Sequence, residues 1–77
     1  MARLSRQFQD AIRLSKIPAY GLALSVGKDP ARFYKELCGA AKADPEDVLI
    51  VKIGLRLGLP AGKIFISDDE FVQERGW

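Results

Sequence analysis

The chain has 77 residues, of which 48% are apolar, with 12 Lys/Arg against 10 Asp/Glu, one cysteine and no histidine. A chain of this length forms one small domain, and we expect a single domain over residues 1–77, with a core over residues 4–66 and a tail over residues 67–77. One cysteine excludes a disulfide framework, and the absence of histidine removes the commonest general base and metal ligand.

The charges are unevenly distributed along the chain. Residues 1–43 contain eight Lys/Arg and three Asp/Glu, whereas residues 44–77 contain four and seven. This polarity points to an anionic partner for the first half. No nucleophile–base pair, metal cluster or phosphate-binding glycine loop is visible, so we expect neither an enzyme nor a cofactor. No membrane span or signal peptide is apparent, and we expect a cytoplasmic protein.

Three helices are expected in the first half of the chain. Residues 4–17 have helical spacing, with Leu4, Phe8, Ala11 and Ile12 on one face, and end before Pro18. Residues 19–26 form a second, short helix that stops at a glycine, which adopts a left-handed conformation without a Cβ penalty. The third helix covers residues 30–38, because an aspartate–proline pair caps and starts it and another glycine ends it.

The segment that follows has two interpretations. Residues 51–59, "VKIGLRLGL", alternate apolar and other residues as a strand does, and a hairpin over residues 49–66 is the alternative. The start Asp44-Pro45 instead favours a helix over residues 46–58, with a buried stripe formed by Val48, Val51, Leu55 and Leu59. We favour the helix.

The end of the chain contains two shorter signals. Residues 60–65, "PAGKIF", indicate a short helical turn. Ser67 and Glu70 have capping-box spacing, which predicts a last helix through Phe71 and Arg75 that stops at Gly76. The predicted core of the whole domain is Phe8, Ile12, Leu22, Ala23, Val26, Phe33, Leu37, Val51, Leu55 and Phe65.

Residues 8–65 resemble the Cro/repressor-type, or XRE-like, family of helix-turn-helix DNA-binding domains. The resemblance lies in "LALSVG", "DPARFYKELCG" and "LIVKIGLRLGLPAGKIF", with Ala23, Gly27 and Phe33 at the family's spacing. It implies an all-α, compact five-helix fold, here with a short extra helix in the tail. It also implies that residues 30–38 are the recognition helix of a small phage or bacterial transcriptional regulator that binds double-stranded DNA.

Three positions depart from the family pattern. Ala19 stands where the family usually has a polar residue that touches the DNA backbone. Lys28, after the turn glycine, and Glu36, three residues after Phe33, stand where the family usually has apolar residues. On a helical wheel Phe33 and Leu37 define the buried side, which leaves Glu36 at its edge.

The candidate DNA contacts combine this helix with nearby basic and tyrosine side chains. Arg32 is the expected base reader because its guanidinium can grip guanine with two bonds. Arg3 and Arg6 suggest an N-terminal arm that follows phosphates. Cys38 is expected to be a small, partly buried hydrophobe. The candidate DNA-binding residues are Lys28, Ala31, Arg32, Lys35, Tyr34, Lys42, Tyr20 and Arg6.

Other functions remain open from the sequence. The acidic, aromatic tail "ISDDEFVQERGW" fits an antitoxin that binds DNA and a toxin-type protein partner. Its residues Phe71 and Trp77 suggest either a homodimer contact or packing back onto the domain's own core. A helical or α+β interaction module without DNA binding is the third alternative, and a hairpin over residues 49–66 would favour it.

Overall fold

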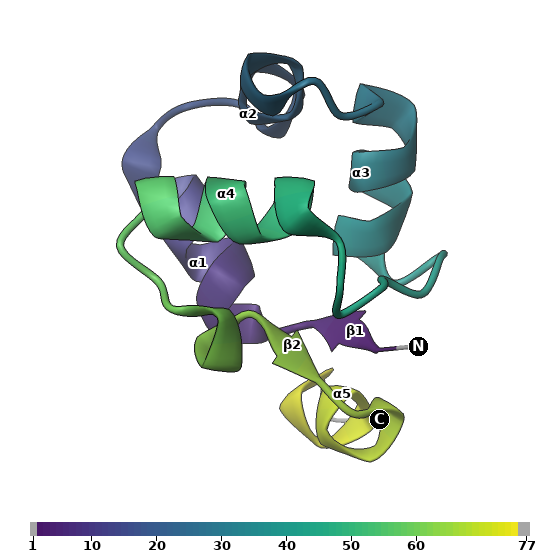
Figure 1. Cartoon of the computed structure of the whole chain (residues 1–77). Helices are drawn as coiled ribbons and strands as arrows, with labels where there is room; N and C mark the ends of the chain where they lie inside the picture. Colours follow the sequence, from purple (N-terminus) through teal and green to yellow (C-terminus); the bar gives the residue numbers. More distant parts are fainter. Residues whose placement is uncertain (1, 76–77) are drawn as a thin grey trace.

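A computed structural model describes residues 2–75 and shows a mostly helical domain with a small two-stranded sheet (Figure 1). Helices α1, α2, α3 and α4 surround the core, and the sheet and α5 close one end of the domain (Figure 1). The elements are β1 (Arg3–Leu4), α1 (Arg6–Ser15), α2 (Ala19–Val26), α3 (Pro30–Cys38), α4 (Val48–Arg56), the 3-10 turn η1 (Ala61–Lys63), β2 (Phe65–Ile66) and α5 (Asp68–Arg75).

The first helix is shorter than predicted because its first residues belong to the sheet. Leu4 pairs with Phe65 in the antiparallel sheet, so the chain at this point is extended. Helix α1 then begins after Ser5, whose Oγ accepts a hydrogen bond from the backbone N–H of Phe8 at 3.1 Å and donates one to the carbonyl of Lys63 at 2.7 Å. A serine at this position satisfies an otherwise unpaired N–H group, which fixes the start of the helix.

The predictions for α2 and α3 are confirmed. Gly27 ends α2 in the left-handed region with φ of 81°, a backbone conformation that a side chain disfavours. Asp29 then caps α3 by accepting a hydrogen bond from the N–H of Ala31 at 3.1 Å, and Pro30 occupies the first helical position. Gly39 ends α3, again with positive φ.

Residues 48–56 are helical, so the hairpin alternative is wrong, but the buried face of α4 differs from the predicted stripe. The core-facing residues are Ile50, Ile53 and Gly54, whereas Val48 and Leu55 are 64% and 61% exposed. Two apolar stripes of the same spacing share this helix, and the sequence pattern does not distinguish them. The helix cap is also different, because Asp47 accepts hydrogen bonds from the first N–H groups of α4 and Asp44 caps only the preceding turn.

The small sheet was not predicted, and it joins the two ends of the described chain. Strand β1 is antiparallel to β2, with Arg3 opposite Ile66, and Ala2 forms an isolated bridge with Ala43. The predicted tail helix is confirmed as α5, in which Ser67 Oγ accepts a hydrogen bond from the N–H of Glu70 at 3.2 Å. The predicted stop at Gly76 lies outside the described residues.

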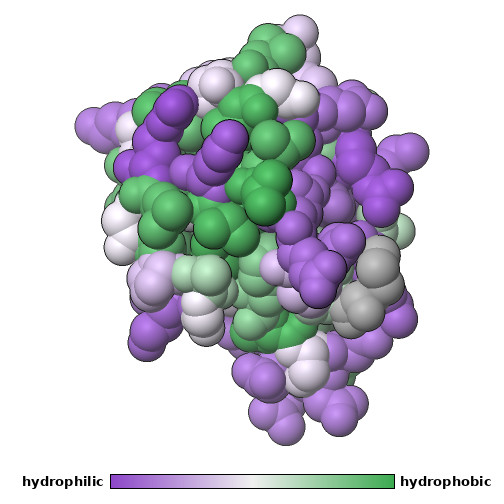
Figure 2. All heavy atoms as spheres, viewed as in Figure 1, coloured by the Kyte–Doolittle hydropathy of each residue, from purple (hydrophilic) through white to green (hydrophobic). Residues whose placement is uncertain are grey.

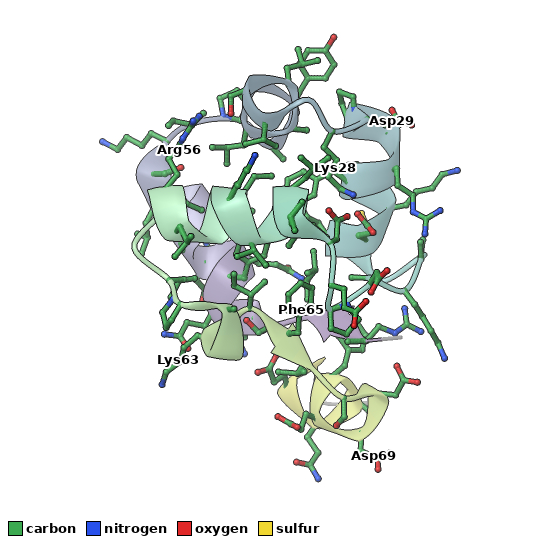
Figure 3. The ribbon with its side chains drawn as sticks, viewed as in Figure 1. Lys28, Asp29, Arg56, Lys63, Phe65 and Asp69 are labelled. Atoms are coloured by element: carbon green, nitrogen blue, oxygen red, sulfur yellow. The ribbon has the colours of Figure 1, made fainter. Side chains whose placement is uncertain are left out.

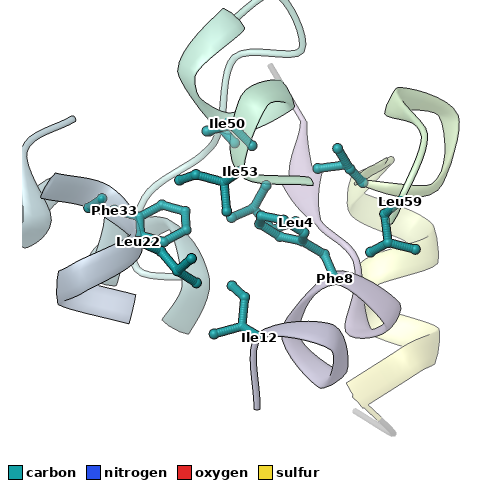
Figure 4. Packing of buried hydrophobic residues seen from close by; sticks show 11 residues of the cluster. Leu4, Phe8, Ile12, Leu22, Phe33, Ile50, Ile53 and Leu59 are labelled. Carbon is teal, nitrogen blue, oxygen red and sulfur yellow. The ribbon is translucent and has the colours of Figure 1, made fainter. Parts of the chain in front are cut away.

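The core is built from every helix except α5 (Figure 4). Phe8 and Phe33 lie at its centre, with ring centroids 6.3 Å apart in an edge-to-face arrangement. Burial confirms the predicted core residues Phe8, Ile12, Leu22, Ala23 and Phe33, while Val26, Leu37 and Phe65 pack against them half-buried. Val51 is half-buried, and Leu55 was wrongly assigned to the core. The buried set also includes Leu4, Ala43, Ile50, Ile53, Leu59 and Ile64.

Candidate nucleic-acid interface

Helices α2 and α3 form a compact pair around Gly27. The turn between them consists of residues 27–29, and Lys28 N–H bonds back to the carbonyl of Ala23 at 2.9 Å, which holds the turn tightly against α2. Ala23 is fully buried, which allows the two helices to approach closely. Phe33 faces the core, so the opposite side of α3 is presented to solvent.

The exposed side of α3 carries most of the predicted DNA-contact residues. Ala31, Arg32 and Lys35 are exposed, as the helical wheel predicted, and Tyr34 is exposed as well. Arg32 Nε lies 3.7 Å from the Glu36 carboxylate, so the base of its guanidinium is loosely tethered while half of the side chain remains accessible. The face therefore offers two cations on one helix, separated by about one turn.

A shallow apolar groove lies between α2 and α3, next to this face. Its lining combines Tyr20 of α2 with Ala31 and Tyr34 of α3, together with Ala19 and Pro30. Both tyrosines are 65% exposed, so their hydroxyl groups are accessible beside an apolar floor. A side-chain hydrogen bond with Cys38 raises the pKa of Tyr34 above its ordinary value of 10.0. The phenol is therefore protonated at neutral pH and can donate a hydrogen bond.

The structure corrects the placement of Lys28. Its side chain is only 8% exposed and points inward between α2, α3 and the start of α4 (Figure 3). The ammonium lies 2.8 Å from Asp47 Oδ2 and 3.1 Å from Glu36 Oε1. Glu36 was expected at the edge of α3, but it is 3% exposed. We therefore remove Lys28 from the candidate DNA contacts, because a buried and paired ammonium cannot reach a phosphate.

Burial and ion pairing have opposite effects on the pKa values of Lys28 and Asp47. Burial alone would lower the pKa of Lys28, but the hydrogen bond to Asp47 and the negative charge of Glu36 outweigh it and raise the pKa above its ordinary value. Burial would likewise raise the pKa of Asp47, but the hydrogen bond from Lys28 and that from the N–H of Leu49 lower it. Lys28 and Asp47 are thus charged at neutral pH. With Glu36, they join the turn, α3 and the cap of α4.

This cluster brings together two charges that the resemblance led us to expect to be apolar. Lys28 and Glu36 stand at positions where the family usually has apolar residues, and here they contact each other. An ion pair therefore joins the turn to α3, with Asp47 as a third member. In the sequence, Lys28, Glu36 and Asp47 are separate charges, and no local pattern indicates that they pair.

The remaining predicted contacts lie away from the exposed face of α3. Lys42 Nζ is 3.1 Å from Asp68, whose pKa is lowered by hydrogen bonds from Lys42 and Arg3. Arg3 lies over the ring of Phe71 in α5, so it does not form the predicted phosphate-tracking arm. Arg6 is exposed beside a cleft between α1 and α5.

Two further predictions concern Cys38 and the tail. Cys38 is exposed rather than partly buried, because α3 ends there and its side chain lies on the solvent side. The tail folds back on the domain through α5, where Phe71 packs against Gly39. Trp77, the other residue of the predicted homodimer contact, lies outside the described residues.

Comparison of the chain with protein-family models, curated proteins and solved structures finds no match. Among the described residues, no helix has the length and apolar character needed to cross a membrane. Within the same part of the chain, no three His, Cys, Asp or Glu side chains gather in a way that could hold a metal ion.

Proposed function

We propose that this protein is a sequence-specific double-stranded DNA-binding protein of the Cro/repressor type, with α3 as its recognition helix and transcriptional regulation as its role. The observation that carries the proposal is the pair α2–α3, joined by a tight turn at Gly27, with one face of α3 packed on the core. Its other face carries two accessible cations and the exposed Tyr34, and Tyr20 of α2 lies beside it. An α-helix held in this way has the size and exposure to enter a major groove.

The chemistry of the face also supports DNA as the partner. Arg32 and Lys35 supply hydrogen-bond donors for guanine or phosphate, and the groove at Ala31 supplies an apolar surface that suits a thymine methyl group. Tyr20 and Tyr34 can donate hydrogen bonds to the DNA backbone. Lys28 is no longer part of this face, but its ion pair with Glu36 holds α3 in its orientation.

The test begins with selection of bound duplexes from a random library, followed by titration of the preferred site at several salt concentrations. If Arg32 reads a base, Arg32→Ala should cost about 1–3 kcal/mol of binding free energy and relax the preference at one position. Substitution of a residue that contacts only phosphate should weaken binding to all DNA sequences alike and reduce the salt dependence of binding by about one unit of slope. We expect Lys35→Ala to combine both effects.

Lys63→Ala is the matched control, because it removes one exposed cation from η1, outside α2 and α3 (Figure 3). It should change binding much less than the α3 variants, and circular dichroism should show that all variants keep the fold. If folded Arg32→Ala and Lys35→Ala bind every duplex as the original protein does, α3 is not the recognition helix.

A further inference from the structure

The exposed face of α4 is more apolar than a helix facing water normally is. Val48 and Leu55 lie two turns apart and are both more than 60% exposed, and half-buried Val51 lies between them. We call these three residues the α4 stripe. Hydrophobic surface extends over α4 and toward α2 in Figure 2. Clustered apolar side chains of this kind on a small domain mark an interaction surface.

The charges around the α4 stripe are arranged by sign along the helix. Exposed Asp44 and Glu46 precede the N-terminus of α4, whereas exposed Lys52 and Arg56 belong to its C-terminal half. Two such helices side by side in the same direction would place like charges together. In the antiparallel arrangement, the acidic end of each helix lies beside the basic end of the other, and the helix dipoles are also opposed.

The stripe is self-complementary in that antiparallel arrangement. A two-fold axis near Val51 places Val48 of one copy against Leu55 of the other, and Glu46 of one copy beside Arg56 of the other. A shallow groove between α2 and α4, formed by Ser25, Val26, Lys52, Leu55 and Arg56, lies next to this contact. It offers space for the smaller valine side chain from the second copy.

From these observations we propose that the α4 stripe binds the α4 stripe of a second copy of this chain, antiparallel, in a two-fold symmetric dimer. None of the proposed DNA-contact residues of α2 and α3 belongs to the stripe, so the dimer does not depend on the proposed function. A contact formed mainly by one helix from each copy is small, and the dimer should therefore be weak and dependent on concentration.

Sedimentation equilibrium of the full chain, from about ten micromolar to about one millimolar, tests the dimer. The apparent mass should rise toward that of two chains, and Leu55→Glu should weaken association at least about tenfold. Leu14→Glu is the matched control, since Leu14 is 78% exposed on α1, outside the stripe, and its substitution should leave association unchanged. A chain that stays monomeric throughout, or folded Leu55→Glu that associates as the original does, would overturn the proposal.

Exchange of charges tests the antiparallel orientation separately. Glu46→Arg and Arg56→Glu should each weaken the dimer, because each places like charges together twice across the two-fold axis. The double variant restores opposite charges and should associate within about threefold of the original protein. If the dimer of the double variant is weaker than the original by the product of the two factors measured for the single variants, the antiparallel orientation is wrong. Circular dichroism checks the fold, because Arg56 also donates a hydrogen bond to Ser25 Oγ within one chain.

Discussion

Lys28 and Glu36 are charged side chains that pack inside the domain, and their pairing can be tested by a double-mutant cycle. Lys28→Met should destabilise the fold by about 3–5 kcal/mol, because it leaves the Glu36 carboxylate buried with only the Arg32 guanidinium, 3.7 Å away and half exposed, beside it. The double variant Lys28→Met/Glu36→Leu should recover most of this loss, since an apolar pair of similar size needs no partner. Urea unfolding of Lys28→Met, Glu36→Leu and the double variant measures the three losses of stability. A loss in the double variant equal to the sum of the two single losses would contradict the pairing.

The same cluster makes stability depend on pH in two ranges. The pKa of Asp47 is lowered in the fold, so its contribution is complete above the ordinary aspartate value of 3.8 and is lost as the pH falls below it. The pKa of Lys28 is raised, so its contribution is complete below 10.5 and is lost as the pH rises above it. Asp47→Asn keeps an N-cap residue but should flatten the acid limb of the stability curve measured by urea unfolding. An unchanged acid limb would show that Asp47 does not contribute.

Some residue-level features of the site could be predicted from the sequence and others could not. The exposure of Ala31, Arg32 and Lys35 follows from the helical period once Phe33 and Leu37 are taken as buried, whereas Tyr34 and Glu36 both lie at the edge of that side, where the period does not decide. The burial of Lys28 could not be predicted in this way, because its partner Asp47 lies 19 residues away. Local periodicity shows which side of a helix is apolar, but it does not show which charge on another element faces it.

At the scale of elements, the glycine inside α4 has a packing role that outweighs its poor helix propensity. A Cβ atom at Gly54 would collide with the side chain of Ile64, which is fully buried against this point of α4. Gly54→Ala should therefore destabilise the domain by about 1–3 kcal/mol, although alanine is the better helix former. Gly21→Ala in α2 is the control, because its Cβ would have ordinary contacts at 3.8 Å, and it should be neutral or stabilising. Thermal unfolding distinguishes the two, and equal effects would contradict the packing role.

The helices with strong end signals were predicted best. Asp29, Pro30 and Gly39 set the limits of α3 through backbone hydrogen bonding and φ, which are local effects that the sequence displays directly. The rotation of α4 was not predicted, because the stripe at residues 48, 51 and 55 has the same spacing as that at residues 50, 53 and 57. The close approach of Ile64 to Gly54 favours the second stripe, and that contact between α4 and the segment after η1 depends on tertiary structure.

At the scale of the whole molecule, the ends of the described chain are joined by contacts that no local pattern indicated. Strand β1 pairs with β2 some 60 residues later, and Asp68 at the start of α5 binds both Arg3 and Lys42. Two-residue strands have too few residues to show an alternating pattern. The sequence therefore predicted the mostly helical character of the domain but not the sheet that closes it.

Leu4 tests whether this closure supports the whole domain. Although it lies in β1, its side chain is fully buried in the core between the helices. Leu4→Ala should cost about 2–5 kcal/mol, a large part of the stability of a small domain. Leu14→Ala is the control, because it removes the same atoms from a side chain exposed to solvent. We expect urea unfolding, followed by circular dichroism, to show one cooperative transition with a much lower midpoint for Leu4→Ala and an almost unchanged midpoint for Leu14→Ala. If Leu4→Ala lowers the free energy of unfolding, followed by the helical circular dichroism signal, by less than about 1 kcal/mol, the helices fold independently of the sheet.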